Sequence, residues 1–503
     1  MDSNFVQSTK ERRQVFSISI RYQENSKLFK VKRTQSDESP MGALSMTVEE
    51  IERETSAFER ALKKGRTQLD EAKIIEALVS LRQMFSVMRP GTKDSILEEL
   101  IDRKVIDEIM ALFKTAVKER EIEMVRELTW LFQVIFTCSH ELLMRIVELG
   151  VLPLFDQILN FDDLDILENL IWAYANLVAF NETVRDVMDS IELVERIYLV
   201  VKQSMKDSKE FKLMRSFILF LGQFFCIKPF QSFDKIRKYF NIAVKFFSVI
   251  DDDQLNEIII EIMEFLLLCT NLYDNEDFNE FMDNEISLQF VDRLIDLMME
   301  KNQKIAKTSV EILRNVFFFE HPKQLELLNS PLLDYLKHNL EKKIDYSENL
   351  KLCLNIAATG KEFVQQIIEK DIAFAILLNA KNNHFLFEEL TSELEALISI
   401  FSSEDSNLLL DYALKNFSLI GEILLKLKID IPNSTCNKLG EFLRVLLDLG
   451  DFTHIFTDKR KNPIVEEIVK RPEILQALEY VQVNRFSEFD NQFKTLIDYI
   501  DFQ

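Results

Sequence analysis

The residue types and spacing with the clearest chemical meaning lie in the segment ENLIWAYANLVAF. Glu168, Trp172 and Asn176 follow one another at i, i+4 and i+8, so in a helix they share one face. A carboxylate pairs with cations, an indole ring attracts them, and a side-chain amide both donates and accepts hydrogen bonds. Trp172 could instead be a core aromatic, but its register with the two polar residues favours exposure. The face therefore indicates recognition of another molecule.

Catalytic and metal-binding patterns are missing from the sequence. It contains no glycine-rich phosphate loop, nucleophile elbow, HExxH or cluster of cysteines and histidines. The five cysteines lie 43 to 88 residues apart without a CxxC pair, which is typical of buried reduced thiols in a cytosolic or nuclear protein. Cys138 and His140 lie close together, but this pair alone does not match the spacing of a zinc site. We expect no enzyme activity, no cofactor and no metal.

A helical segment recurs along the chain and would position the candidate face. Successive copies are 42, 47, 44, 48, 40 and 45 residues apart. Their reference positions are Val134, Asn176, Gln223, Leu267, Asn315, Asn355 and Ile400. An all-helical period of about 40 to 47 residues is typical of armadillo or HEAT repeats, in which each unit needs its neighbours to bury its apolar face.

Composition agrees with a chain of long helices. The 503 residues include only 9 glycines and 9 prolines, and apolar residues recur at helical spacing in stretches such as VRDVMDSIELVERIYLVV. The 41 phenylalanines are expected to fill the layers between repeats. Because a solenoid grows by adding units, we expect one elongated all-α domain instead of several globular ones.

Charge divides the chain into two parts. Residues 1–33 carry eight basic and three acidic side chains, a net charge of +5, although the whole chain carries −23. The remainder therefore carries −28, so it would attract a tethered basic segment and repel nucleic acid. A solvated basic tail without a specific partner is the alternative that charge alone leaves open. Residues 34–47 are expected to form a flexible linker.

No segment predicts secretion or membrane insertion. The first thirty residues lack the uninterrupted apolar core of a secretory signal. The most apolar stretch, IIIEIMEFLLLC, is interrupted by Glu261 and Glu264 and is shorter than a bilayer span of about 20 residues. We expect a protein that stays on the cytosolic side.

The basic segment RRQVFSISIRYQENSKLFKVKR resembles the importin-beta-binding arm of importin-alpha, the adaptor of nuclear protein import. The family pattern is an arginine cluster, an apolar-Leu-Arg-Lys step, and then Leu-Phe-Lys-Arg-Arg. The matching positions are Arg12, Arg13, Ile20, Arg21, Leu28, Phe29, Lys30, Lys32 and Arg33. The resemblance implies that this arm binds importin-beta as a helix, and that its last basic cluster can occupy the protein's own ligand groove.

Most of the remaining chain is also similar to importin-alpha. RELTWLFQVIFTCSHELL and ENLIWAYANLVAF look like two consecutive units of the family, and KRKNPIVEEIVKRPEILQALEY is similar to its closing repeat. The resemblance implies an all-α armadillo-repeat solenoid over residues 48–503. It would be a right-handed superhelix of about ten repeats, preceded by a flexible basic arm over residues 1–33.

The resemblance also implies a role for the shared face. In the family this face lines a concave groove in which asparagine amides bind the backbone of an extended cargo peptide. Tryptophan rings hold the stems of its lysines or arginines, and carboxylates bind their charged ends. The ligands would be basic nuclear localization signals of cargo proteins. The candidate binding residues are Trp130, Glu168, Trp172, Asn176, Gln223, Asn315 and Asn355.

Several positions depart from the family pattern. Val134 replaces the asparagine that would accompany Trp130, and Leu219 and Gln223 replace a tryptophan and an asparagine. Other side chains that do not match the pattern are Phe180, Glu311, Lys351, Ala396 and Ile400. Because each lost hydrogen bond is worth about 0.5 to 1.5 kcal/mol, several losses together predict weaker binding of nuclear localization signals.

Two hypotheses follow. The first is a divergent nuclear import adaptor that shuttles between cytoplasm and nucleus and binds importin-beta and basic cargo signals. A recycling exportin with Ran-GTP would be a further partner implied by the family. The second is an armadillo scaffold of the same ancestry whose remodelled groove binds a different protein. The basic arm favours the first hypothesis, and the departures along the groove favour the second.

Overall fold

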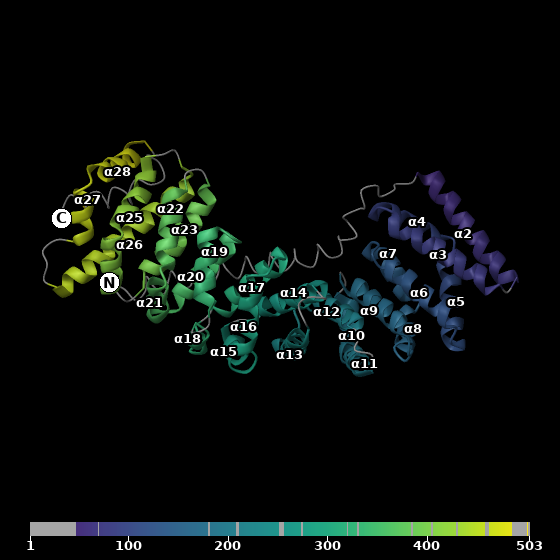
Figure 1. Cartoon of the computed structure of the whole chain (residues 1–503). Coiled ribbons are helices and arrows are strands. Elements are labelled where there is room, and N and C mark those ends of the chain that lie inside the picture. Colours follow the sequence, from purple (N-terminus) through teal and green to yellow (C-terminus); the bar gives the residue numbers. More distant parts are fainter. Residues whose placement is uncertain are drawn as a thin grey trace. The chain divides into compact units, whose positions relative to one another are not determined.

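Helices form the long regular elements of the protein, as the sequence predicts (Figure 1). The computed structural model describes residues 47–68, 70–179, 182–207, 211–250, 256–272, 275–318, 320–328, 331–383, 386–403, 406–428, 431–457, 462–484 and 500. The predicted arm, and the predicted linker except for Thr47, lie outside these residues. The prediction of an all-α armadillo-repeat solenoid is confirmed for the described part of the chain.

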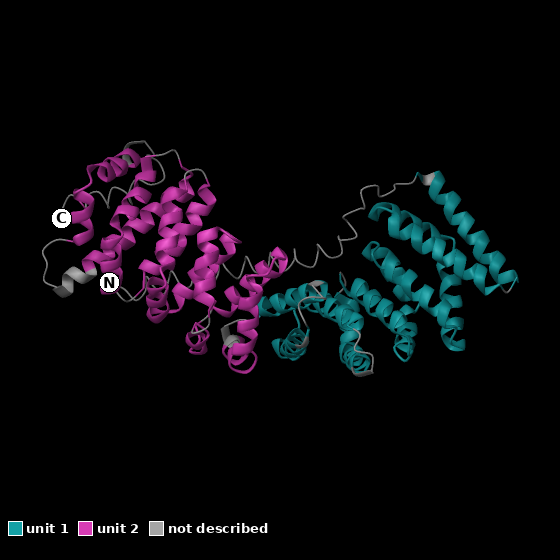
Figure 2. Ribbon diagram, in the orientation of Figure 1, with its two compact units in different colours: residues 1–272 teal, residues 273–503 magenta. Residues whose placement is uncertain are grey.

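The chain divides into two compact units, coloured separately in Figure 2. Unit 1 covers residues 1–272 and unit 2 covers residues 273–503. The helices of unit 1 are α2 (Val48–Gln68), α3 (Glu71–Val87), α4 (Pro90–Asp102), α5 (Val105–Glu119), α6 (Ile122–Ile135), α7 (His140–Glu148), α8 (Val151–Ile158), α9 (Leu164–Val178), α10 (Glu182–Ser190), α11 (Leu193–Asp207), α12 (Lys212–Phe225), α13 (Phe233–Val249) and α14 (Asn256–Leu272).

Unit 2 continues the same all-helical pattern. A short 3-10 helix, η2 (Leu425–Lys428), follows one of its α-helices. The α-helices are α15 (Asn275–Asn284), α16 (Leu288–Leu297), α17 (Gln303–Val316), α18 (Lys323–Leu327), α19 (Leu332–Lys342), α20 (Tyr346–Thr359), α21 (Lys361–Glu369), α22 (Ile372–Asn382), α23 (Phe387–Phe401), α24 (Ser406–Lys415), α25 (Phe417–Leu424), α26 (Asn433–Thr457), α27 (Pro463–Val469) and α28 (Pro472–Asn484).

Equivalent helices of successive repeats pack side by side within each unit. In unit 1, α3, α6, α9, α12 and α14 form one such row, which we call the α9 row (Figure 1). In unit 2, α17, α20, α23 and α26 form the corresponding α20 row, and α19, α22, α25 and α28 form a second row. Each helix thus buries its apolar face against its counterpart one repeat away, which is how a solenoid forms a continuous core.

Hydrogen bonds between neighbouring repeats show the repeat period directly. Asn176 donates to the carbonyl of Gln133, 43 residues earlier, and Tyr346 donates to Glu393, 47 residues later. The Nη2 atom of Arg145 lies 2.7 Å from a carboxylate oxygen of Asp102, again 43 residues away. These three separations fall within the predicted spacing of 40 to 48 residues.

Aromatic rings fill the layers between helices, as expected from the many phenylalanines. The rings of Phe113 on α5 and Phe132 on α6 stack with centroids 5.5 Å apart. Phe155 on α8 meets Phe132 edge-on at 6.2 Å and Tyr174 on α9 at 5.4 Å. All four rings are buried, and such pairs contribute about 0.5 to 1.5 kcal/mol each beyond burial. This cluster fixes α9 against α6 and α8.

Candidate protein-binding face

Helix α9 carries the three residues that the sequence singles out. The helix begins after Asp163, whose carboxylate accepts a hydrogen bond of 3.0 Å from the Ile166 N–H and so caps it. Apolar side chains at helical spacing are buried along the face that packs against α6 and α12. Glu168, Trp172 and Asn176 are each partly exposed. They form a face that we call the α9 face.

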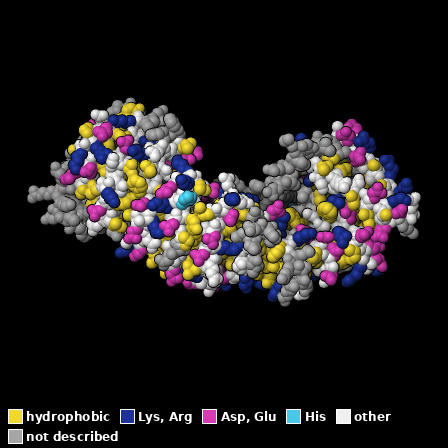
Figure 3. All heavy atoms as spheres, in the orientation of Figure 1, with side chains coloured by type: hydrophobic (Ala, Val, Ile, Leu, Met, Phe, Trp, Pro, Cys, Tyr) yellow, Lys and Arg dark blue, Asp and Glu magenta, His cyan; other side chains and the backbone are white. Residues whose placement is uncertain are grey.

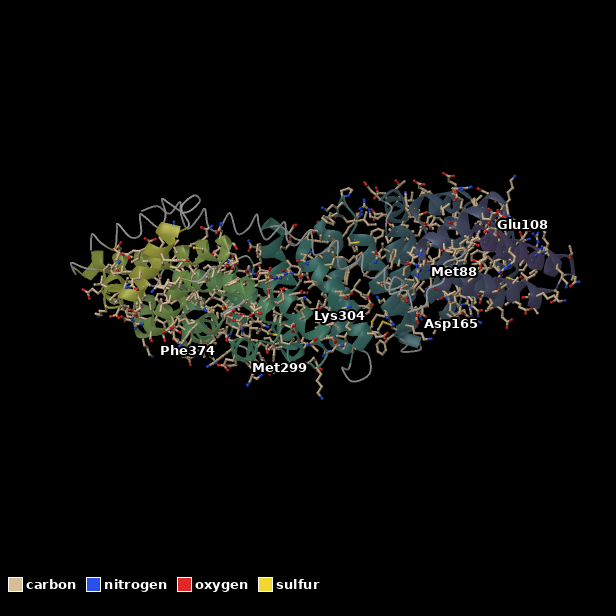
Figure 4. The ribbon with its side chains drawn as sticks, turned by 90° about the horizontal axis from the view of Figure 1, so that it is seen from above. Met88, Glu108, Asp165, Met299, Lys304 and Phe374 are labelled. Atoms are coloured by element: carbon tan, nitrogen blue, oxygen red, sulfur yellow. The ribbon has the colours of Figure 1, made fainter. Side chains whose placement is uncertain are left out.

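Charged side chains lie around the start of the α9 face. The Nη2 atom of Arg126 on α6 lies 2.7 Å from the Asp163 carboxylate. Burial disfavours ionisation of Asp163, but the hydrogen bonds from Arg126 and the Ile166 N–H outweigh it and hold the pKa of Asp163 below its usual range. Asp165, labelled in Figure 4, lies in the first turn of α9, and its carboxylate is 3.8 Å from Lys212 Nζ. Sequence reasoning did not identify these four groups.

The amide of Asn176 takes part in packing between repeats. Its Nδ2 donates to the carbonyl of Gln133 on α6 at 2.9 Å. A primary amide has a second N–H and an oxygen that accepts two hydrogen bonds. Asn176 therefore links α6 to α9 and retains hydrogen-bonding capacity for a ligand.

Trp130 lies on α6, the neighbour of α9 in the same row, and its side chain is 41% exposed. The guanidinium carbon of Arg82 on α3 lies 3.5 Å from the centroid of its ring. Glu127, one turn before Trp130, pairs with Arg82 through its carboxylate. A cation from the protein itself thus covers one side of this indole, which sequence reasoning did not predict.

The next helix of the row does not continue the exposed face. Leu219 and Gln223 on α12 are each only 6% exposed, because α12 packs between α9 and α14. Arg215, at the start of the same helix, lies 2.7 Å from Glu257 of α14. The predicted binding residue Gln223 is therefore buried in this structure.

In unit 2 the two predicted asparagines face the interior or the preceding repeat. Asn315 on α17 is 1% exposed. Asn355 on α20 is partly exposed, and its Nδ2 donates to the carbonyl of Arg314 on α17 at 2.8 Å. This bond spans 41 residues and repeats the geometry of Asn176 and Gln133 in unit 1. The structure does not bring these asparagines together with a tryptophan in unit 2.

Ion pairs occupy the positions one turn before these asparagines. Glu311 lies 3.7 Å from Lys307, and Lys351 lies 2.8 Å from Glu348. Glu348 is also 2.6 Å from the buried Arg314. Burial opposes ionisation of Glu348, but Arg314 and Lys351 outweigh it and hold its pKa below the usual range. The α20 row thus presents charges that are already paired with each other.

Surface charge is mixed on both units. On the face shown in Figure 3, Lys and Arg side chains lie among Asp and Glu side chains on each unit.

The described residues hold no group of three or more His, Cys, Asp or Glu side chains placed for a metal ion. Nor does any described helix combine the length and apolar character needed to span a membrane. The importin-beta-binding candidates between Arg12 and Arg33 lie outside the described residues.

Comparison with known proteins gives one relative in sequence and several in structure. No family model matches the chain. Importin subunit alpha-2 of Arabidopsis thaliana is 21% identical over 234 residues, which cover 46% of this chain and 40% of that protein. The match therefore spans well under half of the relative's length.

Solved structures with the same fold cover most of the chain. An engineered protein superposes with a TM-score of 0.65 at 15% identity, over 89% of this chain and 99% of its own. A structure from work on a phosphorylation switch in the interaction between cadherin and beta-catenin gives a TM-score of 0.52 at 11% identity, over 89% and 96%. At these identities the likeness establishes the fold alone. The chain thus has an armadillo-repeat fold, and less than half of it is distantly similar in sequence to an importin-alpha.

Proposed function

We propose that this protein is an adaptor that binds a basic peptide segment of a partner protein on the α9 face of unit 1. The observation that carries the proposal is the arrangement of Trp172 between Glu168 and Asn176, one helical turn away on either side, with all three side chains partly exposed. A ring, a carboxylate and an amide on one face suit a peptide that presents a lysine or arginine beside a free backbone.

Two of the proposed residues would bind a basic side chain of the peptide, and the third would bind the peptide backbone. Trp172 would stack against the aliphatic stem and charged end of a basic side chain, worth about 0.5 to 2 kcal/mol depending on desolvation. Glu168 would pair with the same cation, and Asn176 would bond the peptide backbone through the amide groups that its link to Gln133 leaves available. A net charge of −28 outside the first 33 residues would draw basic segments toward the surface.

The basic arm would provide the second half of the adaptor. Residues 1–33 carry a net charge of +5 and match the importin-beta-binding pattern, so we assign them to importin-beta. Cargo proteins with basic nuclear localization signals would then be the ligands of the α9 face, and the protein would shuttle between cytoplasm and nucleus. A recycling exportin with Ran-GTP would complete such a cycle.

A second candidate is a scaffold that binds a different protein through a remodelled surface. Burial of Gln223 and Asn315 favours it, as does the ion pair between Lys351 and Glu348. These features remove much of the amide row that a long extended signal would need. They limit the proposed cargo site to the α9 face, where a short basic segment is sufficient.

Assembly of a three-component complex tests the adaptor proposal. The full-length chain would be mixed with importin-beta and a fluorescent carrier that bears a lysine-rich segment, and the complexes separated by size. The proposal predicts one complex with all three proteins. Trp172→Ala should lose the carrier and keep importin-beta. Replacing Arg12, Arg13, Lys30, Lys32 and Arg33 by alanine should do the reverse.

The composition of the wild-type complex separates the two hypotheses. Loss of the carrier alone from the wild-type complex would leave an importin-beta-binding scaffold with another ligand. Failure to bind importin-beta would contradict the adaptor role, whatever the carrier does.

A further inference from the structure

We propose that the guanidinium of Arg82 covers one face of the Trp130 ring and keeps ligands away from it. The proposed cargo surface then binds one basic side chain of a ligand, at Trp172. The inference rests on the proposed function, because it specifies which ligands the same surface accepts. A ligand lysine or arginine would bind at Trp172, whereas Trp130 is closed to it by the protein's own guanidinium.

The position of Arg82 supports occupancy of the ring. Its guanidinium carbon lies 3.5 Å from the Trp130 ring centroid, which is contact distance for a planar cation stacked on an aromatic face. The Nε atom of Arg82 donates to Glu127, and Nη2 lies 3.5 Å from the second oxygen of the same carboxylate. The side chains of Arg82 and Glu127 are only 12% and 11% exposed. Arg82 therefore has both an aromatic and a charged partner.

Displacement of Arg82 by a ligand would be unfavourable. A basic ligand side chain could form the same contacts with Trp130 and Glu127, so the exchange gains no new type of interaction. Arg82 competes from within the folded chain, and an intramolecular group acts at a high effective concentration. Arg82 should thus keep the position against peptides of modest affinity.

Trp172 differs from Trp130 in this respect. Within the described residues, no Lys or Arg side chain lies over the Trp172 ring. Each tryptophan nevertheless has a glutamate about one turn before it, Glu127 before Trp130 and Glu168 before Trp172. Removal of Arg82 would therefore leave a second pair of ring and carboxylate of the same composition as the α9 face. Arg82 is the side chain that makes the two places different.

Fluorine NMR of the full-length protein labelled with 5-fluorotryptophan tests this inference. The chain contains two tryptophans, so two resonances can be assigned with the single variants Trp130→Phe and Trp172→Phe. The probe is a short lysine-rich peptide blocked at both ends. We expect it to shift the Trp172 resonance alone in the wild type, and both resonances in Arg82→Ala, with affinity raised about 3- to 10-fold.

Arg82→Lys is the matched control, because it keeps a cation within reach of the ring and should leave Trp130 unresponsive. A peptide-induced shift of Trp130 in the wild type would overturn the inference, since the ligand would then displace Arg82. So would a Trp130 resonance that stays unmoved in Arg82→Ala while Trp172 responds. If neither resonance responds in any variant, the proposed function fails instead.

A measurement without peptide tests the occupancy separately. Acrylamide quenching of Trp130 fluorescence, in a Trp172→Phe background, should increase about two-fold when Arg82 is replaced by alanine, because one ring face becomes open to solvent. Arg82→Gln serves if the alanine variant does not fold. An unchanged quenching constant would show that Arg82 does not cover the ring, and would overturn the inference even if no peptide binds.

Discussion

At the scale of residues, the same side-chain types serve both packing and recognition in this protein. Asn176 and Asn355 each donate to a backbone carbonyl one repeat earlier, at 2.9 and 2.8 Å. Trp130 binds a cation from its own chain, whereas Trp172 carries none among the described residues. Whether an asparagine or a tryptophan can bind a ligand therefore depends on the contacts that its side chain already makes with the adjacent repeat. Among the described residues, Trp172 is the tryptophan whose ring no Lys or Arg side chain covers.

A buried carboxylate in unit 2 gives the clearest pH dependence at this scale. Glu393 on α23 is fully buried, and it accepts hydrogen bonds from Tyr346 at 2.7 Å and from Asn383 at 3.4 Å. Burial raises its pKa to about 7, although these hydrogen bonds and Lys343 act in the opposite direction. Lys426 donates to the Asn383 carbonyl, and burial lowers the pKa of Lys426.

The raised pKa of Glu393 predicts that unit 2 becomes less stable as pH rises. The folded protein holds this proton up to about pH 7, whereas the unfolded chain releases it near pH 4.5. The stabilisation is therefore fully present below about pH 4.5 and lost as pH rises to about 7. In full it amounts to about 3 kcal/mol, of which about 2 to 3 kcal/mol is lost between pH 5 and pH 7.5. We expect Glu393→Gln to reduce the difference in unfolding free energy between pH 5 and pH 7.5 by this amount.

Urea unfolding at the two pH values measures this difference. Glu395→Gln is a suitable control, because the Glu395 side chain is 42% exposed on the same helix and lies 3.6 Å from Lys438. It should leave the pH dependence close to that of the wild type. Equal pH dependence in Glu393→Gln and the wild type would show that the pKa of Glu393 is not raised and that its carboxylate is already ionised in the folded protein at pH 5.

At the scale of elements, the rows of equivalent helices determine what each face can present. Helix α9 packs between α6 and α12 and exposes its polar face, whereas α12 buries Leu219 and Gln223 at the positions that correspond to Trp172 and Asn176. Leucine is among the most often buried residues, whereas glutamate is rarely fully buried unless it is paired, so Leu219 suits the covered surface of α12 and Glu168 suits the exposed face of α9. The proposed site is accordingly limited to one helix and its neighbour.

Close approach of two elements near the end of unit 2 requires a glycine. A Cβ atom at Gly450 on α26 would lie 2.0 Å from Asn462 Oδ1. Asn462 cannot easily move, because its Nδ2 donates to the Leu447 carbonyl at 2.8 Å and its Oδ1 accepts from the Ile464 N–H at 2.9 Å, which caps α27. Gly450 thus allows α26 and the start of α27 to meet.

We expect Gly450→Ala to destabilise unit 2 by about 1 to 3 kcal/mol, the usual range for an overpacked interior. Gly91→Ala is the matched control in the first turn of α4, where a Cβ atom meets nothing within 4 Å. It should change stability by less than about 1 kcal/mol. Thermal unfolding of both variants measures the effect. Equal midpoints for Gly450→Ala and the wild type would mean that the two elements separate without cost.

The sequence predicts elements more completely than it predicts contacts between them. The register of Asn176 and Asn355 gave the repeat period, because one apolar face recurs in each unit whatever the surface carries. Burial of Asn315 and the contact of Arg82 with Trp130 could not be foreseen. They depend on how adjacent helices are set against each other and on side-chain rotamers, and a residue spacing of 48 does not specify either.

At the scale of the whole molecule, charge organises the proposed interactions. The chain beyond residue 33 carries −28 and the first 33 residues carry +5, so one protein holds both an acidic body and a basic segment. Basic ligands would be drawn to the body over distances of about 8 Å at physiological salt, and would meet the mixed local charges only on contact. Net charge thus favours encounter, whereas Trp172, Glu168 and Asn176 would provide specificity.

The most direct test of the central claim is the affinity of the full-length protein for a fluorescent lysine-rich peptide, measured by anisotropy. We predict binding that Trp172→Ala weakens about 5- to 30-fold, which corresponds to the loss of one cation–π contact. Phe374→Ala is the control, because Phe374 is an exposed aromatic residue (40%) that lies in unit 2, outside the α9 face. It should bind like the wild type. Absence of binding, or equal affinity of the wild type and Trp172→Ala, would contradict the assignment of a basic-peptide site to the α9 face.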